Sequence, residues 1–267
     1  MISMVIRMLK SQTTILNING EIFSIPSPIQ TAFLIKNSGA PYSKEVINPA
    51  SKSSQYSSNF SKALNLGIYG ADLGYVTIYD QTQDAIGYLN AAKKLADELG
   101  VSGAFDAHTV ERFTKNLGNK DSMLVLVGVA YRSSDAYLKN NDRNDVSGLV
   151  LAGGWIESLF FATNVYKTKP GEDVKRRIAE QKSSLQSLIK LLTQFYSQPE
   201  YTEFIDNLND LSTLYDGIEF KYAYEKPTTD AEKKVTTINS KTDIKITPEQ
   251  IESISQKVKS IRSQIVG

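Results

Sequence analysis

Residues 146–166 read VSGLVLAGGWIESLFFATNVY, and this stretch decides the fold. It is long enough to cross a membrane as a helix, but Glu157 lies in its middle, small polar residues interrupt it, and no second span adjoins it. A helix that is apolar on every side is otherwise found at the centre of a large helical protein. We therefore expect a buried central helix, anchored by Trp155, and no transmembrane segment.

A second unusual helix is predicted over residues 62–80, KALNLGIYGADLGYVTIYD. Each of its glycines costs about 1 kcal/mol relative to alanine inside a helix. Steps of three and four residues place these glycines on one face, where another helix can approach closely and gain dispersion contacts. The residues expected at such close packing are Gly67, Gly70, Ala71 and Gly74 here, and Gly148 and Ala152 in the central helix.

Two carboxyl groups lie in apolar surroundings. Asp72 is expected on the side of its helix opposite the glycines, and Glu157 on the side of the central helix that holds Gly153 and Gly154. A buried carboxylate needs a partner or takes up a proton. If the two helices face each other, both acids and several tyrosines line one pocket. The candidate ligand-binding residues are Tyr69, Asp72, Tyr75, Tyr79, Trp155 and Glu157; the alternative is that they are satisfied groups of the core.

The periodicity of the whole chain predicts a mainly α protein with about nine helices packed as antiparallel helical hairpins, in a bundle or an irregular stack of helix pairs. Asn19-Gly20 between isoleucines predicts a small hairpin at residues 14–25. The expected helices span about 28–38, 57–80, 82–99, 106–117, 121–140, 146–167, 172–197, 199–218 and 247–267. Gly39 and Gly100 are expected to end two of them.

The segment from residue 219 onward has a different character. We expect an alternating strand at 219–224, a loop at 225–234, and a strand hairpin of 235–238 with 242–246. Thr247 and Gln250 form a predicted capping box that starts the last helix. We predict three parts: an extension with a hairpin (1–26), a helical domain (27–218), and strand-like segments plus a C-terminal helix packed on that domain (219–267).

Composition excludes several classes of function. Lys and Arg total 30 against 29 acidic residues, without a basic stripe, so no nucleic-acid partner is expected. The chain has no cysteine and one histidine, His108, which we expect to be solvated; thiolate and multi-histidine metal sites are thus excluded within one chain. No glycine-rich phosphate loop follows a strand. We assign no catalytic residue, cofactor or metal site.

Several motifs resemble an uncharacterised family of bacterial all-helical proteins, many of them predicted envelope lipoproteins without a known activity. They are ALNLGIYGADLGY at 63–75, IPSP at 25–28, KKLADELG at 93–100, AGGWIE at 152–157, VTTINS at 235–240 and ITPEQI at 246–251. The resemblance extends from about residue 22 onward. It implies a lipid-anchored location at the periplasmic face of the envelope, although this sequence shows neither a signal peptide nor a cysteine for lipidation.

Three functions follow from these observations. The one favoured is a helical binding or interaction protein of the bacterial cell envelope, with a protein or small-molecule partner and no enzymatic activity. The second is a carboxylate-dependent, hydrolase-like enzyme that uses Asp72 and Glu157 as acid and base, which requires both in one solvent-reachable pocket. The third is a structural subunit of an oligomer. It would pair through the apolar seam of the last helix, formed by Ile251, Ile254, Val258, Ile261 and Ile265.

Overall fold

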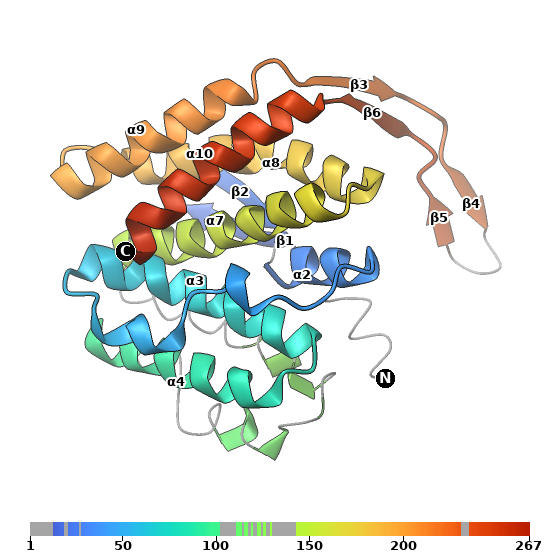
Figure 1. Ribbon diagram of the computed structural model, residues 1–267. Helices are drawn as coiled ribbons and strands as arrows, with labels where there is room; N and C mark the ends of the chain where they lie inside the picture. The colour runs from blue at the N-terminus through green and yellow to red at the C-terminus, as the bar shows by residue number, and fades with distance from the viewer. Residues whose placement is uncertain are drawn as a thin grey trace.

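The computed structural model describes residues 13–18, 21–26, 28–101, 143–230 and 235–267, together with isolated positions between 111 and 129. The fold class is confirmed, because helices make up most of the described chain and the strands form short two-stranded antiparallel sheets (Figure 1). The α-helices with described bounds are α2 (Pro28–Asn37), α3 (Asn59–Ile78), α4 (Thr82–Glu98), α7 (Asn144–Thr168), α8 (Glu172–Thr193), α9 (Pro199–Leu214) and α10 (Pro248–Val266). Two short 3₁₀ helices, η1 (Lys44–Val46) and η2 (Ala50–Ser54), precede α3.

Helix α7 forms the centre of the molecule, as its sequence predicts. Helices α2, α3, α8 and α10 all pack against it, and every residue from 146 to 163 except Leu151 is buried. Among the described residues, α7 is the one helix that has the length and hydropathy of a membrane span, and 94% of its most apolar 18-residue window lies inside the protein. Its apolar surface is therefore covered by the rest of this chain.

Local signals in the sequence set several helix ends. The capping box of α10 is present: the Thr247 side chain accepts a hydrogen bond from the Gln250 backbone at 3.2 Å, and the Gln250 side chain accepts one from the Thr247 backbone at 2.8 Å. Gly39 and Gly100 follow α2 and α4 with φ of 75° and 70°, the left-handed backbone that favours glycine. Both predicted helix ends are confirmed.

The closest contact in the core joins α3 to α7. A Cβ atom built on Gly67 would overlap the backbone oxygen of Val150 and lie 2.7 Å from the nitrogen of Gly154. One built on Gly153 would overlap the backbone oxygen of Leu64. The two backbones thus touch directly, which confirms the close packing predicted for Gly67.

The other glycines of the predicted stripe have different neighbours. A Cβ on Gly74 would lie 3.5 Å from Ile29 of α2, which is an ordinary contact, and one on Gly148 would lie 3.1 Å from Leu192 of α8. Gly74 therefore does not make the close backbone contact predicted for it, and its neighbour is α2 rather than α7. A helical wheel gives the direction of each small residue but not which neighbour covers it.

The N-terminal hairpin is confirmed at the level of its strands. Strands β1 (Thr13–Ile18) and β2 (Glu21–Pro26) pair antiparallel, with Ile18 opposite Glu21 and Thr13 opposite Pro26. Strand β2 contacts α8.

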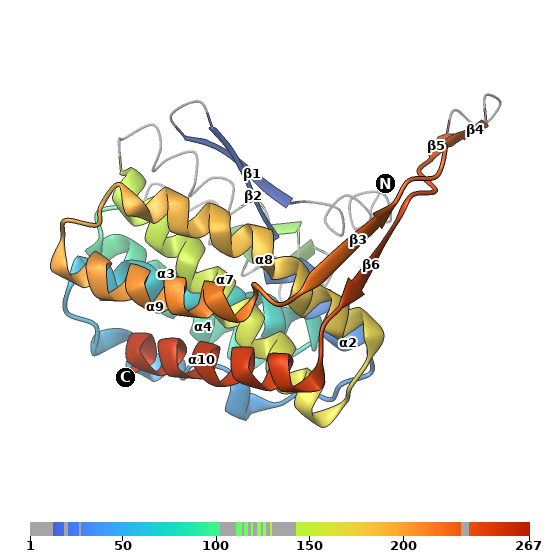
Figure 2. The ribbon, with the colours of Figure 1, turned by 90° about the horizontal axis from the view of Figure 1, so that it is seen from above.

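The four remaining strands form an arm that projects from the helical body (Figures 1 and 2). Strand β3 (Glu219–Ala223) pairs with β6 (Lys241–Lys245), and further out β4 (Thr228–Asp230) pairs with β5 (Val235–Thr237). Between the two ladders, residues 224–227 on one strand lie opposite residues 238–240 on the other. This difference of one residue makes a bulge, and the Ser240 and Asn239 side chains bond the backbone of residues 225 and 226 there.

The arm corrects two expectations. The predicted hairpin of 235–238 with 242–246 is wrong, because each of these strands pairs with a different partner, β4 and β3. Part of the predicted loop at 225–234 is strand β4. Residues 239–241, where that hairpin would turn, instead lie at the bulge and at the start of β6. The predicted helices at 106–117 and 121–140 lie mostly outside the described residues, and so does His108. The described positions 111–113, 115, 122–123, 125–126 and 129 are helical.

The α3–α7 contact makes a direct prediction. Gly67→Ala should lower the free energy of unfolding by at least about 2 kcal/mol, since two backbones must separate to admit the methyl group. Gly74→Ala in the same helix is the matched control and should leave stability unchanged or raise it by up to about 1 kcal/mol. Urea unfolding followed by circular dichroism measures both. Equal effects of the two substitutions would show that no close contact exists at Gly67.

Candidate functional site

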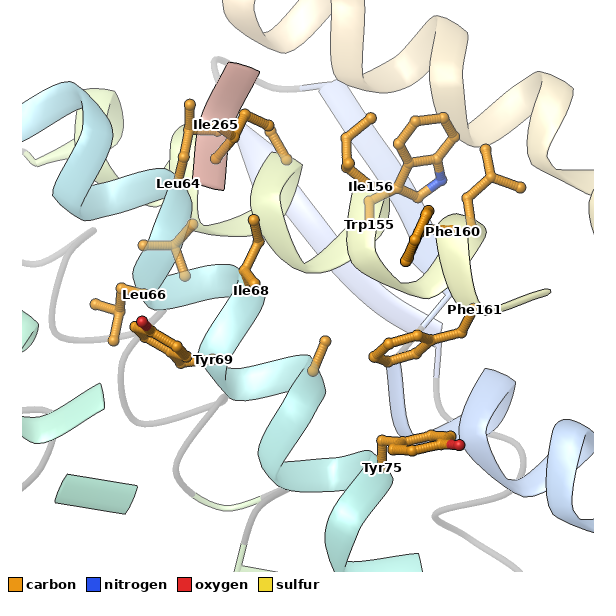
Figure 3. Close-up of a cluster of buried hydrophobic side chains, with 14 of the residues drawn as sticks. Leu64, Leu66, Ile68, Tyr69, Tyr75, Trp155, Ile156, Phe160, Phe161 and Ile265 are labelled. Carbon is orange, nitrogen blue, oxygen red and sulfur yellow. The ribbon is translucent and has the colours of Figure 1, made fainter. Parts of the chain in front are cut away.

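Asp72 and Glu157, the two acids singled out from the sequence, meet in the core between α3 and α7. Both side chains have no exposed surface. The contact follows from how the helices lie. Gly67 lies beside Val150, and further along both helices, about two turns on in α3 and three in α7, the ring of Tyr75 lies 4.8 Å from that of Phe161 (Figure 3). Helices α3 and α7 therefore run parallel, and Asp72 falls next to Glu157.

This position corrects the expected face of Asp72. The helical wheel places it opposite the glycines, yet it packs against the same helix as Gly67 does. The face of α3 that meets α7 includes Leu64 and Tyr75, whose directions on the wheel lie between those of Gly67 and Asp72. Gly67 and Asp72 thus occupy the two flanks of a single contact face, which periodicity alone does not reveal.

Arg262 of α10 supplies the positive charge at this site. Its Nε donates to Glu157 Oε2 at 2.5 Å and its Nη2 to Glu157 Oε1 at 2.6 Å, the two-point geometry of a strong arginine–carboxylate pair. Nη2 also donates to the Val46 backbone oxygen at 3.1 Å, and the guanidinium lies 4.3 Å from the centre of the Phe160 ring. The Arg262 side chain is 12% exposed, so this ion pair is almost dry.

One proton must lie between the two carboxyl groups. Burial, followed by the neighbouring charge of Glu157, raises the pKa of Asp72 well above its usual value. Burial also raises the pKa of Glu157, but Arg262 opposes that shift, so Glu157 carries the negative charge. Asp72 Oδ1 has no donor among the described residues, while Glu157 is within hydrogen-bonding reach of Asp72. A protonated Asp72 that donates to Glu157 satisfies both groups and leaves the site electrically neutral.

Asn48 connects this site to the segment before α3. Its backbone N–H donates to Asp72 Oδ2 at 3.2 Å, and its side-chain amide donates to the Tyr56 hydroxyl at 2.8 Å and to Asn65 Oδ1 at 3.3 Å. Asn65 in turn donates to the backbone oxygen of Ile265 in α10 at 2.9 Å. The network therefore joins α3, α7, α10 and residues 46–56 through buried polar contacts.

Sequence reasoning missed Arg262, Asn48 and Asn65. The one signal in the sequence is that two carboxyl groups in apolar surroundings require a cation. Every basic residue of the chain is then a candidate for that cation. Arg262 is adjacent to Ile261 of the apolar seam, and this position gives no indication that it points inward. Only the packing of α10 across α7 brings it to Glu157.

The candidate tyrosines fasten the segment before α3 rather than line an open pocket. The Tyr69 hydroxyl donates to the Pro49 backbone oxygen at 3.0 Å, and the Tyr79 hydroxyl donates to that of Ala40 at 2.7 Å. The Tyr75 hydroxyl accepts from the Ser43 backbone at 3.1 Å. Burial raises the pKa of all three, that of Tyr79 to about 12, so these hydroxyls stay protonated.

Trp155 lies away from the carboxyl pair. Its indole N–H donates to Gln181 Oε1 of α8 at 2.9 Å, on a different side of α7 from Phe161 (Figure 3). The six candidate residues are therefore not brought into one site: Asp72 and Glu157 meet, Tyr69, Tyr75 and Tyr79 hold a loop, and Trp155 anchors α8.

The chemistry open to the carboxyl pair is limited by its burial. The hollows found at the described surface are lined by other residues, and the described residues contain no group of three or more acidic or histidine side chains that could hold a metal ion. A substrate would need a route to Asp72 and Glu157. The described residues provide none, whereas the ion pair and the shared proton have an evident structural role.

The exposed apolar side chains gather elsewhere, on the arm. Among the described residues, five of the six exposed large hydrophobic side chains belong to it: Phe220, Tyr222, Tyr224, Val235 and Ile238. A groove of about 370 Å³ lies where the base of the arm meets α8, lined by Phe220, Thr242 and Ile244 from the arm and by Glu180, Lys182, Ser183 and Gln186 from α8.

Comparisons of this chain with protein-family models, with curated proteins and with solved structures found no match. Within the described residues, the two candidate functional regions are the buried carboxyl pair and the exposed arm.

Removing the cation tests the ion pair. Arg262→Met should lower the free energy of unfolding by about 3–5 kcal/mol at pH 7, because it leaves the Glu157 charge buried and unpaired. The loss should shrink at pH 5, where Glu157 takes up a proton more easily. Lys259→Met, an exposed position on the same helix, is the control and should change stability by less than about 0.5 kcal/mol. A loss that is equal at both pH values would contradict a charged Glu157.

The shared proton predicts an unusual pH dependence. An aspartate in the unfolded chain titrates near pH ~3.9, whereas folded Asp72 keeps its proton to higher pH. Its contribution to stability is therefore complete below about pH 4 and is lost as the pH rises through the folded pKa. Asp72→Asn keeps a hydrogen-bond donor toward Glu157 and should remove this loss of stability with rising pH.

The measurement is the free energy of unfolding in urea at pH 5 and pH 7. The variant should lose less stability over this interval than the parent chain does, while Asp216→Asn, at an exposed position, should behave like the parent. An Asp72→Asn variant with the parental pH dependence would mean that Asp72 is ionised in the fold.

Proposed function

We propose that this chain is a non-enzymatic helical binding protein that contacts a protein partner through its arm, and that it acts in the bacterial cell envelope. The observation that carries the first part is the concentration of exposed large apolar side chains on one projecting element. The location is supported only by the sequence resemblance to envelope lipoproteins.

The arm has a surface suited to contact. Phe220 and Tyr222 share one face of the β3–β6 ladder with their cross-strand partners Ile244 and Thr242, and Tyr224 follows at the next alternate position. We call these five residues the aromatic face. Tyr222 and Tyr224 are 67% and 71% exposed. Contiguous apolar surface of this kind on a soluble body marks interaction sites, and tyrosine is enriched in them because it combines an apolar ring with a polar tip.

A bound partner would also stabilise the arm. An isolated two-stranded hairpin is marginally stable in water, and the described ladder and side-chain hydrogen bonds of the outer part of the arm join its own two strands. Only Ile244 of its described residues packs against the hydrophobic core, and Arg176 of α8 bonds the Thr242 backbone oxygen at 3.1 Å. A partner on the aromatic face would supply the missing layer.

The other two candidate functions receive less support. The carboxylate enzyme requires solvent access to Asp72 and Glu157, and the described residues offer none. The seam of α10 is occupied within the chain, since Ile251, Ile254, Val258, Ile261 and Ile265 are all at most 8% exposed. An oligomer built through that seam would have to open this core.

Site-specific photocrosslinking in the cells that make the protein tests the proposal. A photoreactive amino acid at Tyr222 or Tyr224 should give one discrete protein adduct, whose mass identifies the partner. Lys221, which precedes Tyr222 and lies on the opposite face of the same strand, is the matched control and should give little or none. Adducts of equal yield at all three positions, or at none of them, would contradict a partner on the aromatic face.

A further inference from the structure

We infer that the partner of the aromatic face is a second copy of this chain, so that two arms pack face to face across a twofold axis. This inference rests on the proposed function, since it uses the same surface. It is argued from the distribution of charge on the arm, from the state of its strand edges and from the area that the face exposes.

Charge separates the two faces of the β3–β6 ladder. The face opposite the aromatic one carries cross-strand pairs of opposite sign, Glu219 with Lys245 and Lys221 with Asp243. The aromatic face has no charged side chain within the ladder, but Glu180 and Lys182 of α8 border it at the groove by its base. Covering its outer part, at Tyr222 and Tyr224, therefore buries no ion of the ladder. A matching surface must likewise be uncharged and partly aromatic, and this face itself meets that requirement.

The net charge of the arm disfavours other kinds of macromolecule. Residues 219–245 carry six lysines and five acidic residues. An arm that bound an anionic membrane or a nucleic acid would need a clear basic excess, and one of strong single sign would repel its own copy. A nearly neutral arm allows two copies to approach, and the alternating charges remain on the outer surfaces of the pair.

The edges of the arm are less suited to contact than its face. The bulge between the two ladders interrupts both strands, and lysines and acids flank the open edges, which are two of the usual protections against strand addition. Arg176 already bonds the Thr242 carbonyl at the base. Packing of one face on another therefore fits this arm better than the addition of an extended peptide to an edge.

The exposed area fits a modest symmetric contact. Phe220, Tyr222 and Tyr224 are 41%, 67% and 71% exposed, which corresponds to roughly 350 Å² of aromatic surface at typical ring areas. A twofold contact counts this surface twice, giving about 700 Å². This area lies below the lower limit of about 1,200 Å² for a stable interface, in the range of weak contacts, so we expect a weak, reversible dimer.

Sedimentation equilibrium of the full chain, from about 1 µM to about 1 mM, tests this inference over the affinities of weak and standard interfaces. The parent chain should pass from monomer to dimer. Tyr222→Ser combined with Tyr224→Ser should raise the dimer Kd at least about thirtyfold, the effect of losing a central aromatic contact. Lys221→Ser combined with Ala223→Ser, at the intervening positions, is the matched control and should change the Kd less than about threefold.

A crosslinking experiment provides a second test that does not depend on the tyrosine variant. Because the chain has no cysteine, a single cysteine can be placed at position 222 or 221, and a bismaleimide of about 10 Å span matches the distance between packed sheets. Tyr222→Cys should give a covalent dimer and Lys221→Cys should not.

A chain that stays monomeric throughout overturns the second copy as partner. If photocrosslinking then captures a different protein at Tyr222, the proposed function stands without this inference. A dimer that the tyrosine variant does not weaken, and that crosslinks equally at both positions, overturns the role of the aromatic face as well.

Discussion

The backbones of α3 and α7 touch at Gly67 and Gly153, and most of the internal arrangement depends on this contact. A side chain at either position would enter the neighbouring backbone, so the helices can lie this close only because both positions are glycine. The loss of helix propensity, about 1 kcal/mol for each glycine, is offset by dispersion contacts along two parallel helices. The same approach brings Asp72 against Glu157.

The carboxyl pair follows from that closeness, and it determines what else must be present. Two buried acids cannot both be charged, so one holds a proton and the other needs a cation. Arg262 meets this need from α10, the last helix of the chain. Through Asn48 and Asn65 the same polar groups hold residues 46–56 and the end of α10. Such a network makes a mispacked α10 costly, because any other placement leaves Glu157 without its partner.

The body and the arm differ in how they are stabilised. The helical body has a continuous core around α7, whereas the arm is a projecting pair of strands (Figure 2) with exposed aromatic side chains at Tyr222 and Tyr224. Most of the described polar groups of the core are paired inside the chain; the buried side-chain atoms among them without a hydrogen-bond partner are Asn48 Oδ1, Asp72 Oδ1 and the Tyr215 hydroxyl. The exposed apolar side chains thus lie on the element with the fewest core contacts, and the proposed binding function rests on this contrast.

The sequence by itself determined the helical class, the central position of residues 146–166, the hairpin at 14–25, and the helix ends at Gly39, Gly100 and Thr247. These features depend on residues close together in the chain, where periodicity and capping act directly. It also identified Asp72 and Glu157 as acids in need of partners. Tertiary structure alone decided that they face each other, that Arg262 is their cation, that Gly67 and Gly74 meet different helices, and that β6 pairs with β3. Each of these contacts joins distant segments, and many distant pairings satisfy the same local pattern, so only the packed core selects one.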